Sequence, residues 1–150
     1  MLFFTNFNSG TFKREVTIDS PSGNMGMASL PYKLIVEQIA NKLSVKSFSV
    51  VEWADDEIAD QTLTLDGKDN NSVGFMNSPR IQNANWSQDR DTLTIASKIT
   101  MKFGDKPPVD MKSKEVWTLQ KRGKRLLIIQ TSDGMMGRGP VTTRTVYDKY

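Results

Sequence analysis

Glu115 is the side chain of this sequence with the clearest capacity for chemistry in an enclosed site. Met111, Trp117 and Leu119 lie on one side of a predicted strand, and Glu115 shares that side. A carboxylate buried without a partner costs several kcal/mol or takes up a proton. We therefore expect Glu115 to meet a basic partner.

Two arginines are the candidate partners of Glu115. Arg144 alternates with Val146 in the last predicted strand, and Arg80 begins another predicted strand. A closed barrel brings strands distant in sequence together, so either arginine could reach Glu115 inside the barrel or at its rim. Such a pair would be a polar anchor for a ligand in a mostly apolar cavity. The alternatives are a purely structural ion pair, or a Glu115 that faces solvent at a β-bulge.

Three more side chains complete the candidate ligand-binding set. Ser97 is the one polar residue on the otherwise apolar face of residues 92–103. Trp86 and Trp117 could form an aromatic cavity wall together with Trp53. Tryptophan on the strands of a small β domain belongs more often to the core, so a core role is the main alternative for these three residues.

The sequence contains no histidine and no cysteine. Their absence excludes His-based catalytic triads, cysteine nucleophiles, disulfides, thiolate zinc sites and the usual proton shuttle at neutral pH. An enzyme would have to use Asp, Glu, Tyr or Lys, and no motif assembles such a site. We therefore predict a non-catalytic protein with no metal and no cofactor.

Other chemically suggestive segments have plainer interpretations. The acidic residues at 55–57 and 89–91 match neither a calcium loop nor an identifiable glycosidase pair. The glycine-rich segment 134–139 lacks the Lys-Ser/Thr of a phosphate loop. Its methionines, and those at 25–27, suit an apolar lip around a barrel mouth better than a Cu(I) site.

Length and composition indicate one globular domain that spans residues 1–150. The chain has 37% hydrophobic residues and a net charge of +3, with 20 basic and 17 acidic side chains. The densest basic group, at 121–125, surrounds a glycine and is typical of a charged hairpin turn, so we expect no nucleic-acid partner. No stretch approaches the roughly 20 apolar residues of a membrane span.

The elements that must position these residues are strands. In residues 92–103, apolar and polar side chains alternate, which is typical of a strand with one buried and one solvated face. Residues 32–42 have a helical alternative, but Pro31 precedes them and no N-cap is present, so we predict a strand there as well. Further strands are predicted at 43–53, 61–65, 80–86, 111–119, 126–131 and 141–147.

About ten strands joined by short turns predict an antiparallel up-and-down barrel of eight to ten strands. Closure satisfies the backbone groups at the edges of such a sheet, and the first strand would then meet the last. The alternative architecture is a two-sheet β-sandwich.

The strand motifs resemble a group of bacterial lipocalin-like β-barrel proteins. The motifs that carry the resemblance are Gly10–Phe12, Leu65–Lys68, Trp86 with Thr92–Ile95, Glu115–Leu119 and Val146–Tyr147. The chain departs from the group in two ways, since it lacks a lipidation cysteine and has Phe12 in place of the usual tryptophan.

The resemblance implies a small exported protein, located in the periplasm or the cell envelope. No export signal is visible, because the apolar start at 1–4 is too short for a signal-peptide core. We expect the barrel to bind a small hydrophobic or amphipathic ligand in its lumen. The alternative is a protein-interaction or envelope-scaffold module whose lumen is filled and whose protein partner is unknown.

Overall fold

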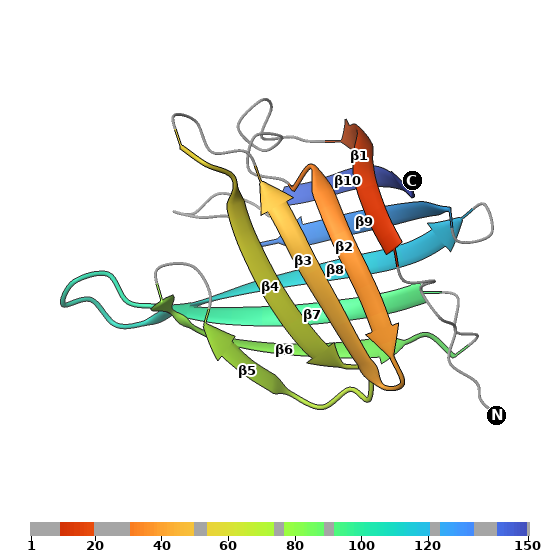
Figure 1. The fold of residues 1–150 in the computed structure, drawn as a ribbon. Coiled ribbons are helices and arrows are strands. Elements are labelled where there is room, and N and C mark those ends of the chain that lie inside the picture. Colours follow the sequence, from red (N-terminus) through yellow and green to blue (C-terminus); the bar gives the residue numbers. More distant parts are fainter. Residues whose placement is uncertain are drawn as a thin grey trace.

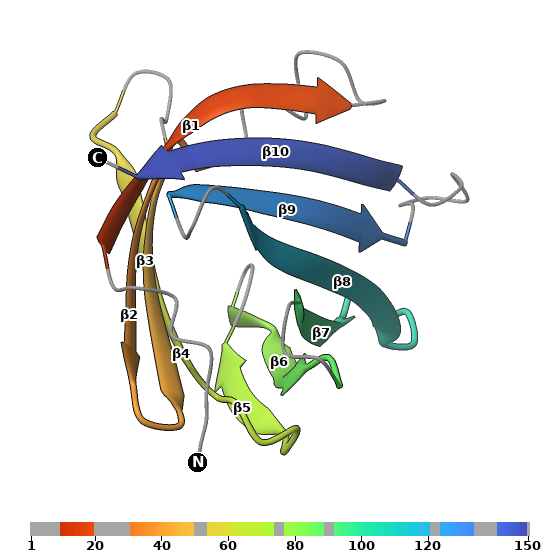
Figure 2. The same cartoon turned by 90° about the vertical axis from the view of Figure 1, so that its right-hand side faces the viewer.

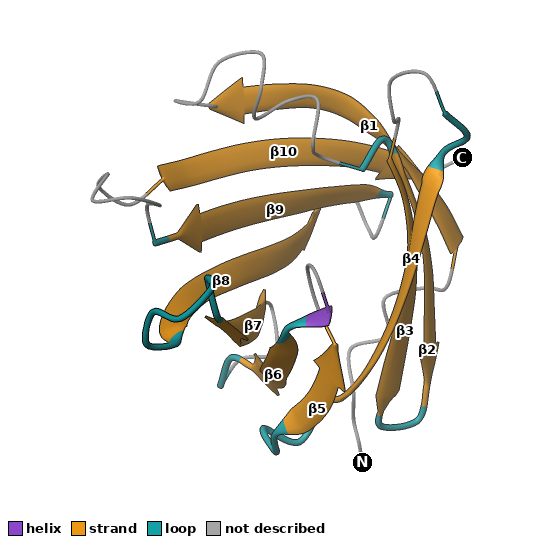
Figure 3. Ribbon diagram, turned by 90° about the vertical axis from the view of Figure 1, so that its left-hand side faces the viewer, coloured by secondary structure: helices purple, strands orange, loops and turns teal. Residues whose placement is uncertain are grey.

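A computed structural model gives the arrangement of most of the chain (Figure 1). It describes residues 10–19, 31–49, 54–73, 77–88, 92–120, 124–133 and 141–149. These residues are almost entirely in strands and turns, as Figure 3 shows, with one short helical turn at Asn77. None of the described segments is a helix long and apolar enough to span a membrane.

Ten strands of the described residues form one antiparallel sheet that curls into a nearly closed barrel. Apart from the ladder between β1 and β10, every ladder joins strands that are neighbours in sequence, which makes the topology up-and-down. The strands are β1 (Gly10–Asp19), β2 (Lys33–Ile39), β3 (Lys42–Ser49), β4 (Glu57–Thr64), β5 (Asn70–Val73), β6 (Pro79–Trp86), β7 (Thr92–Met101), β8 (Val109–Gln120), β9 (Arg125–Ser132) and β10 (Val141–Lys149).

The first strand pairs with the last, as the sequence predicts. The ladder between β1 and β10 runs from the pair Phe12 and Lys149 to the pair Asp19 and Arg144, with two register shifts on the way. Such shifts increase the local twist of a strand and help a sheet to curve. This ladder joins the β1–β4 part of the sheet to the β5–β10 part (Figure 2).

The barrel remains open between β4 and β5, which are the two edges of the sheet. In the part of the chain that the structure describes, no backbone ladder joins these strands, and side chains bridge them instead. Asn70 Nδ2 donates to Thr64 Oγ1 at 3.3 Å, and Gln82 Nε2 of β6 donates to Gln61 Oε1 at 3.3 Å. The seam therefore depends on polar side chains, and one of them, Gln61, also faces the interior.

The interior is apolar at one end and polar further along the strands. On β9, Leu126 and Ile128 are buried in the core, and Gln130 is the next inward residue of that strand. On the antiparallel strand β8, Trp117 is buried, and Glu115, two residues before it in sequence, is the neighbouring inward residue. Burying each large apolar side chain contributes roughly 1.5–3 kcal/mol, so the apolar end stabilises the barrel. The core consists of Phe12, Leu34, Val36, Leu43, Val45, Leu63, Leu65, Ala84, Leu93, Ile95, Trp117, Leu126, Ile128 and Tyr147.

The predicted strands are confirmed with local exceptions. Residues 32–42 are not a helix: they hold β2 and the turn at Ala40 and Asn41 that joins it to β3 in a hairpin. The prediction for Phe103 was wrong, because β7 ends at Met101 and the Phe103 side chain is 45% exposed in the following turn. The sequence analysis also missed β5 and residues 57–60 of β4, since exposed edge strands carry no apolar alternation.

Gly67 occupies a turn in which its lack of a side chain is required. Its φ is +78°, its N–H donates to the Ala84 carbonyl at 3.0 Å, and an added Cβ would lie 2.3 Å from Asn85 Oδ1. Gly104 has a φ of +59°, but an added Cβ there would meet no atom within 4 Å. The two glycines therefore share the backbone constraint and differ in the space around them.

We expect Gly67→Ala to lower the free energy of unfolding by more than Gly104→Ala does. The left-handed backbone should cost each variant about 1–2 kcal/mol, and Gly67→Ala must also displace the Asn85 side chain. Urea denaturation measures both changes. In an Asn85→Ala background, Gly67→Ala should lower the free energy of unfolding by about as much as Gly104→Ala does. Equal losses of this free energy in the two single glycine variants would contradict this account.

Candidate functional site

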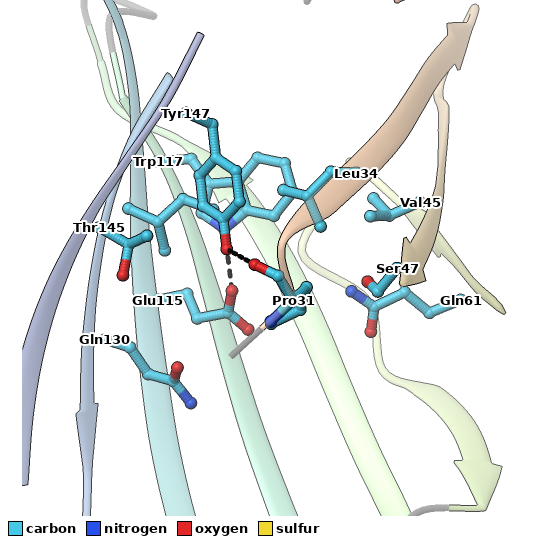
Figure 4. A pocket seen from close by; sticks show the side chains of 11 residues that line it. Pro31, Leu34, Val45, Ser47, Gln61, Glu115, Trp117, Gln130, Thr145 and Tyr147 are labelled. Carbon is cyan, nitrogen blue, oxygen red and sulfur yellow. Dashed lines mark hydrogen bonds between the residues drawn. The ribbon is translucent and has the colours of Figure 1, made fainter. Parts of the chain in front are cut away.

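The candidate site is a cavity of about 150 Å³ inside the barrel, where the apolar end gives way to polar side chains (Figure 4). It lies between β2–β4 on one side and β8–β10 on the other. Its lining residues are Pro31, Leu34, Val45, Ser47, Gln61, Glu115, Trp117, Ile128, Gln130, Thr145 and Tyr147.

The strand register explains why these side chains meet. Glu115 pairs with Gln130 across β8 and β9, and Val45 pairs with Gln61 across β3 and β4. Side chains of directly opposed residues lie on the same face of the sheet, so each pair points into the barrel. Figure 4 shows the two groups facing each other across the cavity.

Two hydrogen bonds organise the cavity wall. Trp117 Nε1 donates to Glu115 Oε1 at 3.0 Å, and the Tyr147 hydroxyl donates to the Pro31 carbonyl at 2.9 Å. Trp117 is 2% exposed and Tyr147 is also 2% exposed, so both rings are rigid walls held by the core. The first bond orients the carboxylate, and the second ties β10 to Pro31, two residues before the start of β2.

Glu115 is partly buried and lines the cavity. Burial raises the pKa of this carboxyl, because removal of water disfavours the charged form. The hydrogen bond from Trp117 and, to a smaller extent, the positive charge of Arg80 act in the opposite direction without reversing the shift. The site therefore disfavours the charged form of Glu115 relative to water, and a cation in the cavity would offset this effect.

The structure separates the two candidate partners of Glu115. Arg80 lies on the inward face of β6, near enough for its charge to act on Glu115, but its Nε donates to Ser72 Oγ at 3.0 Å. No lysine or arginine of the described residues forms a salt bridge with Glu115; the salt bridges found there are Lys46–Asp60 and Arg125–Asp148. The expected ion pair is therefore absent from the described part of the chain.

The prediction that Arg144 lines the cavity was wrong. Its neighbour Thr145 lines the cavity, so alternation turns Arg144 to the outer face, where its side chain is exposed. The apolar pattern of this strand was ambiguous, because Val146 and Tyr147 are both buried although they lie on opposite faces. The sequence analysis assigned the lumen to the face of Val146, whereas it belongs to the face of Tyr147.

The remaining predicted residues take different places. Trp117 lines the cavity and also belongs to the core, so its two expected roles coincide. Ser97 points inward and accepts a hydrogen bond from Gln82 Nε2 at 3.0 Å, but it does not line this cavity. Trp86 is partly buried against the core. Trp53 lies outside the described residues, as do the methionines of 25–27 and 135–136.

Several cavity residues were not predicted, although strand alternation could have identified some of them. Gln130 follows Leu126 and Ile128 at the next inward position, and Thr145 stands two residues before Tyr147. Gln82 was not predicted either. It is 4% exposed, and its amide donates to Gln61, one of the polar inward residues that line the cavity. The place of Ser47 and Gln61 in the cavity wall could be predicted only by knowing which strands face β8 across the barrel.

A second hollow, of about 370 Å³, lies further along β7 and β8. It is mainly apolar, with Ile99, Met101 and Met111 in its wall. Ser113 also lines it and is the next inward residue of β8 after Glu115. The second hollow therefore offers apolar surface next to the cavity, at the inward position of β8 adjacent to Glu115.

Comparison with known proteins does not assign the chain to a family. No family model matches the sequence, and no curated protein matches it significantly. Function must therefore be inferred from the cavity and the residues that line it.

The raised pKa of Glu115 makes stability depend on pH. The native protein holds this proton more tightly than the unfolded chain does, so this contribution is fully favourable in acid and is lost as pH rises from about 4.5 through the raised value. Relative to the wild type, Glu115→Gln should therefore gain stability between pH 4 and pH 8. Urea denaturation across this range measures the difference.

Trp117→Phe provides the complementary variant. It removes a hydrogen bond that favours the charged carboxylate, so its stability should fall more steeply with pH than that of the wild type. The packing loss that accompanies this change is independent of pH and does not alter the slope. Parallel pH profiles for the wild type, Glu115→Gln and Trp117→Phe would refute the assignment of a buried, titrating Glu115.

Proposed function

We propose that this chain is a non-catalytic, lipocalin-like barrel that binds a small amphipathic ligand in its lumen. The observation that carries the proposal is the cavity between the apolar core and the polar inward side chains. Leu34, Trp117 and Ile128 offer apolar surface, while Glu115 and Gln130 offer polar contacts in the same cavity. Ligand sites combine these two features, since apolar contact contributes affinity and a few polar groups fix orientation.

The size of the cavity restricts the ligand. Drug-sized molecules occupy pockets of roughly 300–1,000 Å³. At about 150 Å³, this cavity equals the engineered apolar cavity that binds benzene, so it suits a ligand, or part of one, with a single small ring or short chain. A longer molecule could extend toward Ile99, Met101 and Met111 in the second hollow.

Binding suits the cavity better than catalysis does. General acid–base chemistry requires groups poised to exchange protons with a substrate, usually with a second group that orients the first. Among the described residues that line the cavity, Glu115 and Tyr147 are the titratable ones, and the Tyr147 hydroxyl is committed to the Pro31 carbonyl. Glu115 alone can anchor a ligand.

The second candidate function is a protein-interaction module. Two observations favour it: the core fills one end of the lumen, and β4 presents an edge with no strand paired beyond it among the described residues. Such edges can accept a strand from another chain. A protein that retains no small molecule but binds an extended peptide along β4 would support this alternative.

Native mass spectrometry of protein purified from its own cells tests the proposed function. We expect a retained small molecule in the wild type and its loss in Ser47→Leu, which would add a branched side chain to the cavity wall. The matched control is Lys46→Leu, because Lys46 is the exposed neighbour of Ser47 and points outward. Equal retention by the two variants, or none by the wild type, would exclude the lumen as the binding site.

A further inference from the structure

The Glu115 carboxyl group has one oxygen that accepts a hydrogen bond from the described part of the protein and one that does not. Trp117 Nε1 occupies Oε1 at 3.0 Å, and no other side chain of the described residues donates to either oxygen. The nearby positive charge, on Arg80, is directed to Ser72 and makes no ion pair with Glu115. Buried charges are normally paired, so this carboxylate lacks the cation that would balance it.

The groups around Glu115 can accept hydrogen bonds as well as donate them, and those that line the cavity among the described residues carry no positive charge. Thr145 is 3% exposed and lines the cavity, and its hydroxyl makes no hydrogen bond with another described residue. The amide of Gln130 likewise has no protein partner among the described residues. The Tyr147 hydroxyl donates to the Pro31 carbonyl at 2.9 Å. These oxygens suit a ligand group that donates several hydrogen bonds.

The aromatic rings favour the same kind of ligand. Trp117 and Tyr147 stand beside Glu115 in the cavity wall (Figure 4). The face of an aromatic ring attracts a cation by its quadrupole, and it also contacts apolar groups. An anionic ligand would meet repulsion from a charged Glu115, and a neutral one would offer no charge to offset the burial of the carboxylate.

We propose that the lumen ligand is a small organic amine whose ammonium group binds Glu115 and whose apolar part lies against Leu34, Trp117 and Tyr147. This inference rests on the proposed function and names the chemical class of its ligand. An ammonium group donates to the free Glu115 oxygen and to the neighbouring acceptors, so one ligand group satisfies the whole polar end of the cavity.

The amine also fits the direction of the Glu115 pKa. Burial raises this pKa, so the site favours the protonated carboxyl more than water does. A bound ammonium group replaces that proton and restores the carboxylate. The ammonium group thus takes the place of the proton, and the net charge of the site stays the same.

Three compounds with the same ring and a cationic, neutral or anionic polar group test the inference: benzylamine, benzyl alcohol and benzoate. Calorimetry at pH 7 measures affinity, and the assigned Trp117 indole resonance reports binding at the cavity. We expect benzylamine to bind the wild type at least about tenfold more tightly than benzyl alcohol, as a charge-assisted hydrogen bond would give. Benzoate should bind most weakly.

Two variants separate the cavity carboxylate from the overall charge of the protein. Glu115→Gln should bind benzylamine and benzyl alcohol with about equal affinity. Glu37→Gln removes the same charge from the exposed face of β2 and should keep the wild-type preference for the amine. Thermal unfolding of both variants confirms that they are folded before affinities are compared.

The outcomes distinguish this inference from the proposed function. Equal affinities for amine and alcohol in the wild type, or an amine preference that survives in Glu115→Gln, would overturn the amine while lumen binding stands. A retained natural ligand without a basic nitrogen would do the same. Absence of benzylamine binding also overturns the inference, and the native mass spectrum then judges lumen binding independently.

Discussion

Pairing between β1 and β10 is the interaction on which the rest of the structure depends. It joins the strands at the two ends of the described chain and bends one ten-stranded sheet into a barrel. Without it, β2–β4 would not stand opposite β8–β10, and the cavity between them would have no second wall. The opening that remains lies mid-chain, between β4 and β5, where polar side chains and not backbone ladders hold the strands together.

Closure divides the interior into two physical environments. At one end, large apolar side chains exclude water and supply the stability of the fold. Further along the same strands, inward positions carry amides, hydroxyls and one carboxyl. A barrel selected only for stability would fill these positions with apolar residues, because buried polar groups weaken a core unless they are satisfied. This layer of polar inward positions is the part of the interior on which the proposed ligand binding rests.

Glu115 shows how stability and function oppose each other in this layer. Its environment disfavours the charged form, and the tryptophan that orients it is also one of the most buried residues of the core. The carboxylate is thus held in place rigidly but balanced incompletely. Such an arrangement is costly to an empty barrel and useful to one that receives a cation, since little reorganisation is needed when the ligand arrives.

The sequence by itself determined the all-β class, most strands and the inward position of Glu115 and Trp117, because alternation with a period of two is a local property. It did not reveal β5, whose exposed residues carry no such pattern. Only the tertiary structure decided that Thr145 and not Arg144 enters the cavity, since both faces of that strand bury apolar residues. It also decided that Ser47 and Gln61 face Glu115, because the register around a closed barrel is set by all its ladders together.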